Sequence, residues 1–143
     1  MPSDEIRLVV DTNIIVSAAI SVSRRKRSPE RDLVGRIAEG KLTLLLSDDI
    51  FGEYEEVLSR FVEETARPHI PRKITEEILD GLEDVATFME STPRVSLLRD
   101  PDDAKFLDLA IAGQADYLIT TNLRHFPALP WIVTVHQFFV IEL

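Results

Sequence analysis

Short apolar runs alternate with segments of helical periodicity along the chain. Four runs of mostly β-branched or aliphatic residues predict buried strands, at 6–10, 42–46, 117–120 and 131–135, and a weaker run predicts another at 95–98. Strands that alternate with helices are typical of an α/β fold with a parallel sheet. The pattern therefore predicts an α/β domain whose central parallel sheet has about five strands.

Apolar residues at helical spacing fill the intervals between these runs. Ser28 and Ser47 are suited to cap helix N-termini, Pro29 to a first turn and Gly40 to a helix end. Residues 21–29 predict a basic, Ser-rich loop. The predicted helices cover 14–20, 28–40, 48–61, 74–89, 100–113 and 136–140.

The composition limits the metal sites and the location that the chain can have. The chain has no cysteine, so disulfides and thiolate metal sites are excluded, and a metal would need oxygen ligands or one of three histidines. Oxygen ligands favour Mg²⁺ or Mn²⁺ over zinc. The N-terminus is acidic, unlike a signal peptide, and there is no apolar run of about 18 residues, so we expect no membrane span and a cytoplasmic protein. The length of 143 residues suits a single domain over 1–143.

The charge balance argues against a simple nucleic-acid binder. Asp plus Glu number 25 against 16 Lys plus Arg, for a net charge of −9, whereas binding to phosphates through side chains requires cations. An enzyme that meets phosphates through a bound metal is compatible with that charge. One compact basic run is either a solvated loop or a phosphate contact, and it consists of Arg24, Arg25, Lys26 and Arg27.

Asp11 directly follows the first apolar run. Its carboxylate is therefore expected at the carboxyl edge of the sheet, where ligands bind in open α/β folds. The alternative is that Asp11 caps the helix that follows, a role that Thr12 or Asn13 can also fill.

Glu53 lies beside the apolar face of the helix predicted at 48–61. At about 100° per residue it falls between Ile50 and Val57, whereas Glu56 points away from that face. A position beside a buried face indicates a functional acid. The alternative is a Glu that is favoured by the helix dipole or extends its carboxylate to solvent.

Three acids flank Pro101 at the start of another helix. Asp100 suits the N-cap, and acids in the first turn suit the positive helix end. Asp103 shares a face with predicted core residues and overlooks the interior, so we favour it over Asp102 as a functional acid. Asn122, after the next strand, offers an amide oxygen to a cation, or else closes a capped turn.

These acids are predicted at the ends of neighbouring elements, on one edge of the sheet. Converging carboxylates repel and raise each other's pKa, and a hard divalent cation resolves that conflict. Such a cation can polarise a phosphoryl group and generate hydroxide, which suits phosphodiester hydrolysis. The residues thus predict a metal-dependent nuclease.

Four segments in this order resemble the PIN-domain family (the PilT N-terminal domain). They are 8–13 with Asp-Thr-Asn, 47–58 with Glu53, 100–103 with the Ala-rich helix after it, and 116–126, and together they span nearly the whole chain. They are most similar to the toxins of toxin–antitoxin pairs, such as VapC. The resemblance implies a three-layer α/β/α sandwich, a Mg²⁺- or Mn²⁺-dependent endoribonuclease with RNA as substrate, a cognate antitoxin as partner, and often a homodimer.

The resemblance assigns roles by position. It makes Asp11 and Asp103 the principal metal ligands, and Glu53 a third acid that ligates metal or orients the water. Asn122 stands where relatives often have Asp, and its neutrality removes one charge from the site. The predicted supporting residues are Thr12, Asn13 and Thr120, and the predicted substrate contacts are Arg24, Arg25, Lys26, Arg27 and Arg124.

Other protein classes fit less well. A non-catalytic interaction module with a PIN fold agrees with the acidic total and with Asn122, although all three acids are present. A response-regulator receiver would need paired acids after its first strand, and a haloacid-dehalogenase-type phosphatase would need an acid where Asn13 stands. His125 is interpreted as a phosphate or surface contact rather than a general base, because a metal would already supply hydroxide.

Overall fold

A five-stranded parallel sheet forms the centre of the computed structural model, which describes residues 5–90, 93–96 and 98–142. The strand order is β3-β2-β1-β4-β5, and each neighbouring pair is parallel. The predicted α/β fold with a parallel sheet is thereby confirmed. The strands are β1 (Arg7–Val10), β2 (Thr43–Leu46), β3 (Thr87–Phe88), β4 (Tyr117–Ile119) and β5 (Ile132–Val133).

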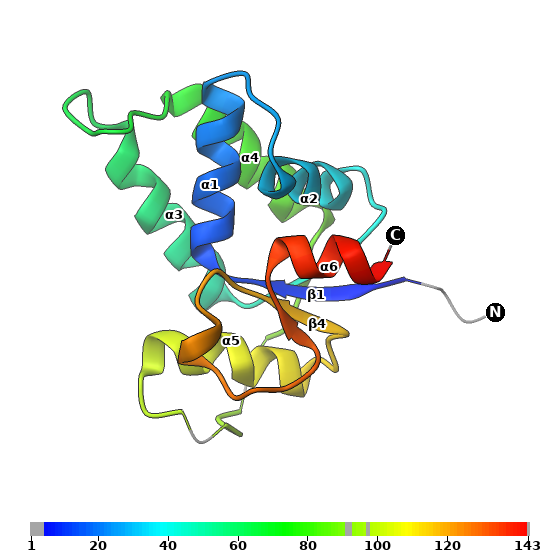
Figure 1. Ribbon diagram of the computed structural model, residues 1–143. Helices are drawn as coiled ribbons and strands as arrows, with labels where there is room; N and C mark the ends of the chain where they lie inside the picture. The colour runs from blue at the N-terminus through cyan, green and yellow to red at the C-terminus, as the bar shows by residue number, and fades with distance from the viewer. Residues whose placement is uncertain (1–4, 91–92, 97, 143) are drawn as a thin grey trace.

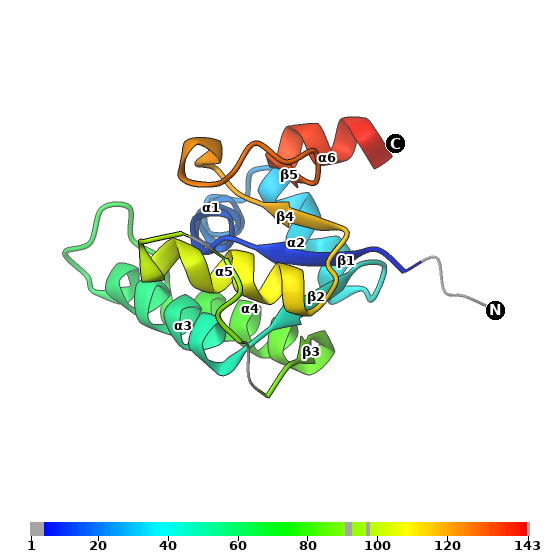
Figure 2. The ribbon, with the colours of Figure 1, turned by 90° about the horizontal axis from the view of Figure 1, so that it is seen from below.

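Helices cover both faces of the sheet and complete three layers (Figures 1 and 2). α5 (Pro101–Ala112) packs on one face, against β1, β2 and β4. On the other face lie α1 (Thr12–Ser23), α2 (Pro29–Ala38), α4 (Arg72–Val85) and α6 (Val135–Glu142). α3 (Asp48–Val62) follows β2 directly and packs against α1 and α4, and a short 3₁₀ turn, η1 (Leu123–His125), follows β4. Among the described residues, no helix is both long and apolar enough to span a bilayer.

The apolar runs became strands because their side chains fill the core between these layers. Leu8, Val9 and Val10 of β1 are fully buried, as are three residues of β2, at 44–46. Strands covered on both faces are expected to read as continuous apolar runs. The predicted caps are confirmed as well, since the Ser28 side chain accepts from the Arg31 N–H at 3.0 Å. Ser47 does the same for α3.

The strand order places a topological switch point at β1. From β1 the chain builds outward through β2 to β3, and it then returns to the other side of β1 to form β4 and β5. In open α/β sheets, ligands bind beyond the carboxyl ends of the strands at such a point. The residues that follow β1 and β4 therefore lie where a ligand-binding or catalytic site is expected.

β3 corrects the prediction of a helix at 74–89. α4 ends at Val85, and Thr87–Phe88 pairs with β2 instead of continuing the helix. Val85 and Phe88 are both more than one-third exposed, so the apolar stripe seen in the sequence does not run into the core at its end. A two-residue strand at a sheet edge is too short to show a period of its own.

The predicted strand at 95–98 is also wrong for the residues that the structure describes there, 95, 96 and 98. The buried carboxylate of Asp108 accepts the backbone N–H groups of Val95 and Ser96, at 3.0 and 2.7 Å. A side chain of α5 thus satisfies donors that a strand would place in a ladder. Residue 97 lies outside the described residues.

Candidate active site

Asp11 is fixed at the point where β1 ends. Its backbone N–H donates to the Ile119 carbonyl of β4 at 2.9 Å, and its side-chain Oδ2 accepts from the Thr120 hydroxyl at 2.7 Å. Thr120 is fully buried, and its hydroxyl oxygen in turn accepts from the Asn122 N–H at 3.0 Å. Asp11 occupies the N-cap position of α1, but its side chain makes no capping hydrogen bond. The Asp11 side chain is therefore bonded to Thr120 rather than to the first turn of α1, and its role as a site residue stays a prediction.

Glu53 projects from α3 toward the N-termini of α1 and α5. One of its carboxylate oxygens accepts from the hydroxyl of Thr12, and the other pairs with the ammonium of Lys105 on α5. The side chains of Glu53 and Lys105 are 23% and 24% exposed. Its neighbours Glu55 and Glu56 are exposed. The helical geometry of the sequence thus distinguished Glu53 correctly as the acid beside the buried face.

Asp103 is the half-buried acid at the N-terminus of α5. Its carboxylate, 22% exposed, lies 3.4 Å from Nδ1 of His125, which belongs to η1. Asp100 acts as the N-cap, because its side chain accepts from the Asp102 N–H at 2.9 Å. Asp102 is exposed. Of the acids in this segment, Asp103 is therefore the one turned inward.

A polar pocket of about 650 Å³ brings the three acids together. We call it the acid pocket, and its lining consists of Asp11, Thr12, Asn13, Asp48, Asp49, Gly52, Glu53, Glu56, Val57, Arg60, Asp102, Asp103, Lys105 and Phe106. The elements that meet here are the end of β1, the first turns of α1 and α5, and one side of α3 from Asp48 to Arg60. First-turn residues of the three helices are thus part of the lining, and the positive partial charges of helix N-termini favour anionic groups there.

Of the other predicted site residues, Thr12 and Asn13 line this pocket, whereas Thr120, Asn122, Arg124 and the basic run do not. Thr120 is buried behind Asp11, and Asn122 is exposed at the start of η1. The basic run 24–27 is exposed and follows the C-terminal end of α1, whereas Asp11 precedes its N-terminal end. At about 1.5 Å per residue, α1 separates the two by roughly 18 Å. A contact between the basic run and substrate stays a prediction.

The surroundings of Asp11 affect its protonation. Burial raises the pKa of the Asp11 carboxyl above its ordinary value, and the charges of Glu53 and Asp103 raise it further. Hydrogen bonds from Thr120 and from the Thr12 backbone act in the opposite direction. Burial, with the charges of Asp11 and Glu53, also raises the pKa of Tyr54 well above its usual range. The Asp11 carboxylate is therefore repelled by the charges of Glu53 and Asp103.

A divalent cation fits two of these acids better than three. Among the described residues, no three acidic or histidine side chains are arranged to hold a metal ion together. Mg²⁺, however, commonly takes one or two carboxylates and keeps several waters. Asp11 and Asp103 line the same hollow and repel each other, so this pair suits a hydrated cation, whereas both oxygens of Glu53 already have partners.

Sequence reasoning missed two polar residues of this site. Lys105 is 52 positions from Glu53 in the chain, so no local pattern indicated their pairing. Tyr54 was counted among apolar residues of α3, and its buried hydroxyl donates to the Val10 carbonyl, directly before Asp11, at 2.5 Å. A tyrosine on a buried helical face was the available signal, because a buried phenol requires a partner.

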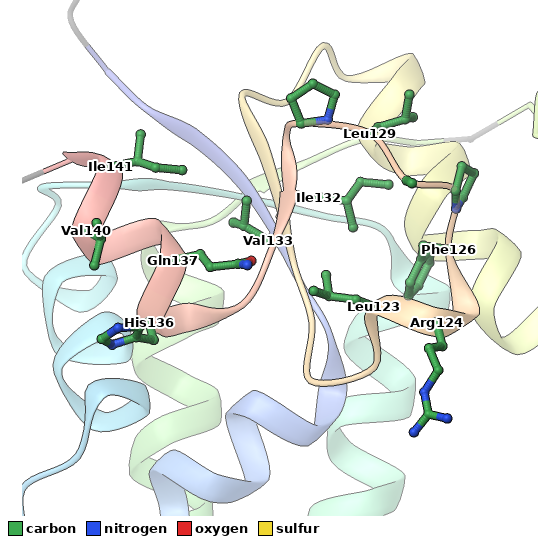
Figure 3. A pocket seen from close by; sticks show the side chains of 13 residues that line it. Leu123, Arg124, Phe126, Leu129, Ile132, Val133, His136, Gln137, Val140 and Ile141 are labelled. Carbon is green, nitrogen blue, oxygen red and sulfur yellow. The ribbon is translucent and has the colours of Figure 1, made fainter.

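A second hollow, here called the apolar groove, lies between η1, β5 and α6 (Figure 3). Its volume is about 950 Å³ and its lining is mostly apolar. Leu123, Ile132 and Val133 point into its centre, while Arg124 extends from its edge (Figure 3). No carboxylate is among the described residues that line it, so the two hollows differ in chemistry.

Inward acids at the end of β1, on α3 and at the start of α5 thus place a candidate site at the switch point of a parallel sheet with helices on both faces. A family model for the PIN domain matches residues 7–124, and the chain belongs to the PIN-domain family. No curated protein matches the chain. Among solved structures, the fold is similar to a chain in the crystal structure of VapBC2 from Rickettsia felis bound to a DNA fragment from their promoter, with a TM-score of 0.59 and 17% identity over 90% of this chain and 97% of that one.

Proposed function

We propose that this PIN domain is a Mg²⁺- or Mn²⁺-dependent endoribonuclease that hydrolyses phosphodiester bonds of RNA. The observation that supports this proposal is the meeting of Asp11, Glu53 and Asp103 at one polar pocket beyond the carboxyl end of β1. The raised pKa of the Asp11 carboxyl, which follows from burial and from the two neighbouring charges, indicates a site that gains from a bound cation.

Asp11 and Asp103 would hold the cation in this proposal. A divalent cation there supplies Lewis acidity toward a phosphodiester. Thr120 fixes the orientation of the Asp11 carboxylate, and Tyr54 fixes the strand end that carries it. Glu53, oriented by Thr12, is the third acid, which ligates the metal or orients the attacking water. Asn122, through its backbone, supports Thr120.

The biological role that we propose is that of a toxin with a cognate antitoxin. The PIN-domain family and the fold likeness to a chain of the VapBC2 structure support it. We further propose a homodimer in the cytoplasm, as the resemblance of the sequence implied. A small neighbouring gene that encodes a DNA-binding protein would support the toxin assignment, and its absence would count against it.

Cleavage of a mixed RNA pool tests the enzymatic proposal. The wild type, Asp11→Asn and Asp103→Asn are purified identically and assayed with Mg²⁺, with Mn²⁺ and with a chelator. We expect metal-dependent cleavage by the wild type alone. Equal activity in all three proteins would indicate a contaminant and overturn the assignment.

A catalytically weak interaction module with the same fold is the second candidate. It is favoured by one observation, the pairing of both Glu53 oxygens with groups of the protein itself. A folded wild type that binds RNA or a protein partner but cleaves no RNA with either metal would favour this module.

A further inference from the structure

Lys105 is a cation placed inside a pocket that is otherwise rich in acids. Its ammonium contacts one oxygen of Glu53, and both side chains are about three-quarters buried. The chain also contains a surface Lys–Glu pair, Lys41 with Glu39, in which both side chains are more than half exposed and the charged atoms are 3.8 Å apart. An exposed pair of that kind contributes little. The rule for exposed pairs therefore does not apply to the largely buried pair of Lys105 and Glu53.

The three acids of the pocket have different partners. Asp11 accepts from the Thr120 hydroxyl, and Asp103 faces His125, whose side chain is about half exposed. Glu53 is the one that is paired with a lysine among the described residues, and Thr12 engages its second oxygen. Two donors thus hold the Glu53 carboxylate, one of them the Lys105 ammonium. Breaking such a partly buried pair leaves an uncompensated charge, which is costly.

We propose that Lys105 is a positioning residue that acts as the internal counter-ion of Glu53 and limits the pocket to one divalent cation, held by Asp11 and Asp103. The inference rests on the proposed metal-dependent function. The ammonium neutralises Glu53 and keeps its carboxylate directed away from coordination. It also repels a second cation at the position where a third acid would otherwise attract one.

The role predicts a gain of metal binding when Lys105 is removed. Without the ammonium, Glu53 becomes an uncompensated carboxylate beside the two other acids, so the pocket becomes more attractive to cations. We expect Lys105→Gln and Lys105→Met to bind Mn²⁺ about tenfold more tightly than the wild type, or to take a second equivalent. Lys105→Arg keeps the charge and should match the wild type.

Titration calorimetry with MnCl₂, supported by the electron paramagnetic resonance signal of free Mn²⁺, measures both affinity and stoichiometry. Lys41→Gln is the matched control, because it removes a lysine from a Lys–Glu pair outside the pocket. The double variant Lys105→Gln/Glu53→Gln should lose the gain, because the released carboxylate is then absent. Far-ultraviolet circular dichroism verifies that each variant is folded, and Lys105→Met preserves the aliphatic stem if Gln destabilises the chain.

Two results would overturn the inference, and they are distinguishable. If the wild type binds one Mn²⁺ and both neutral variants of Lys105 bind it with unchanged affinity and stoichiometry, Lys105 is not the limiting counter-ion. If the folded wild type and Asp11→Asn both fail to bind Mn²⁺, the proposed metal site itself fails.

Discussion

The acid pocket and the apolar groove have no lining residue in common and differ in chemistry, although η1 contacts residues of both. In η1, His125 faces Asp103 in the acid pocket, whereas Leu123 and Arg124 line the apolar groove. The groove is the larger of the two, about 950 against 650 Å³. Carboxylates line only the smaller one among the described residues. The kind of side chain and its burial, rather than the size of a hollow, therefore distinguish the candidate active site in this domain.

The two hollows also differ in how the chain builds them. Residues 123–141, one continuous stretch, supply the entire lining of the apolar groove. The acid pocket draws on residues from 11 to 106 and exists only when β1, α3 and α5 are correctly packed. The catalytic proposal thus depends on the whole fold, whereas the groove is a local feature of the C-terminal part.

The largest effect is expected from neutralising the acids turned into the pocket. Asp11→Asn and Asp103→Asn should each reduce RNA cleavage by at least about 100-fold, because losing a ligand costs more than losing a supporting partner. Asp102→Asn is the matched control, since this neighbouring acid lines the same pocket but is exposed, and it should keep most of the activity. Initial rates on one RNA substrate measure the difference. Equal losses in Asp102→Asn and Asp103→Asn would remove the distinction between them.

Asp11→Asn should also affect the stability of the fold, in the opposite direction to its effect on cleavage. A carboxyl whose pKa is raised in the folded state holds its proton more readily there than in the unfolded chain. Its ionisation therefore destabilises the fold, with no effect below the ordinary pKa and the full effect above the raised one. At pH 7 and without metal, Asp11→Asn should melt at or above the temperature of the wild type. A lower melting temperature would indicate that the carboxylate stabilises the fold.

The contrast between the two regions also explains what the sequence could predict. Strands β1, β2 and β4 were visible because burial on both faces leaves continuous apolar runs. The meeting of Asp11, Glu53 and Asp103 at one pocket could be predicted from strand ends and helical faces, which are local geometry. β3 was misassigned because it is defined by its pairing with β2, which is a tertiary contact. The strand predicted at 95–98 was wrong because the backbone there donates to the Asp108 side chain, which is also a tertiary contact. Lys105 was missed for the same reason, since its partner is distant in the chain.

The next largest effect is expected from Tyr54, whose hydrogen bond holds the residue that precedes Asp11. Tyr54→Phe removes the buried hydrogen bond to the Val10 carbonyl and should lower the free energy of unfolding by about 1–2 kcal/mol. Cleavage should fall by about tenfold, since the strand end that carries Asp11 is less firmly held. Urea denaturation and initial rates measure the two effects. An unchanged rate at reduced stability would limit Tyr54 to a structural role.

A smaller effect is expected from the other tyrosine, which lies outside both hollows. The Tyr117 hydroxyl donates to Glu142 near the end of α6, and this hydrogen bond raises the pKa of Tyr117 to about 12. Because the folded state favours the protonated phenol, the contribution is complete below about pH 10 and is lost as the pH rises through about 12. Tyr117→Phe should therefore be less stable than the wild type at pH 8, by under about 1 kcal/mol for this exposed contact. The deficit should shrink at pH 11 in urea denaturation, and a constant deficit would contradict the assignment.

The smallest effect is expected in the apolar groove itself. Val140 and Ile141 of α6 are 65% and 54% exposed, so replacing either by Ser removes little buried surface and should change stability by no more than about 0.5 kcal/mol. RNA cleavage should also remain at the wild-type rate, because the groove contributes no carboxylate and the acids are positioned by other elements. Initial rates of Val140→Ser and Ile141→Ser, measured beside Asp102→Asn, test this. A loss of tenfold or more at unchanged stability would mean that RNA extends across η1 into the groove, and the two hollows would then form one substrate surface.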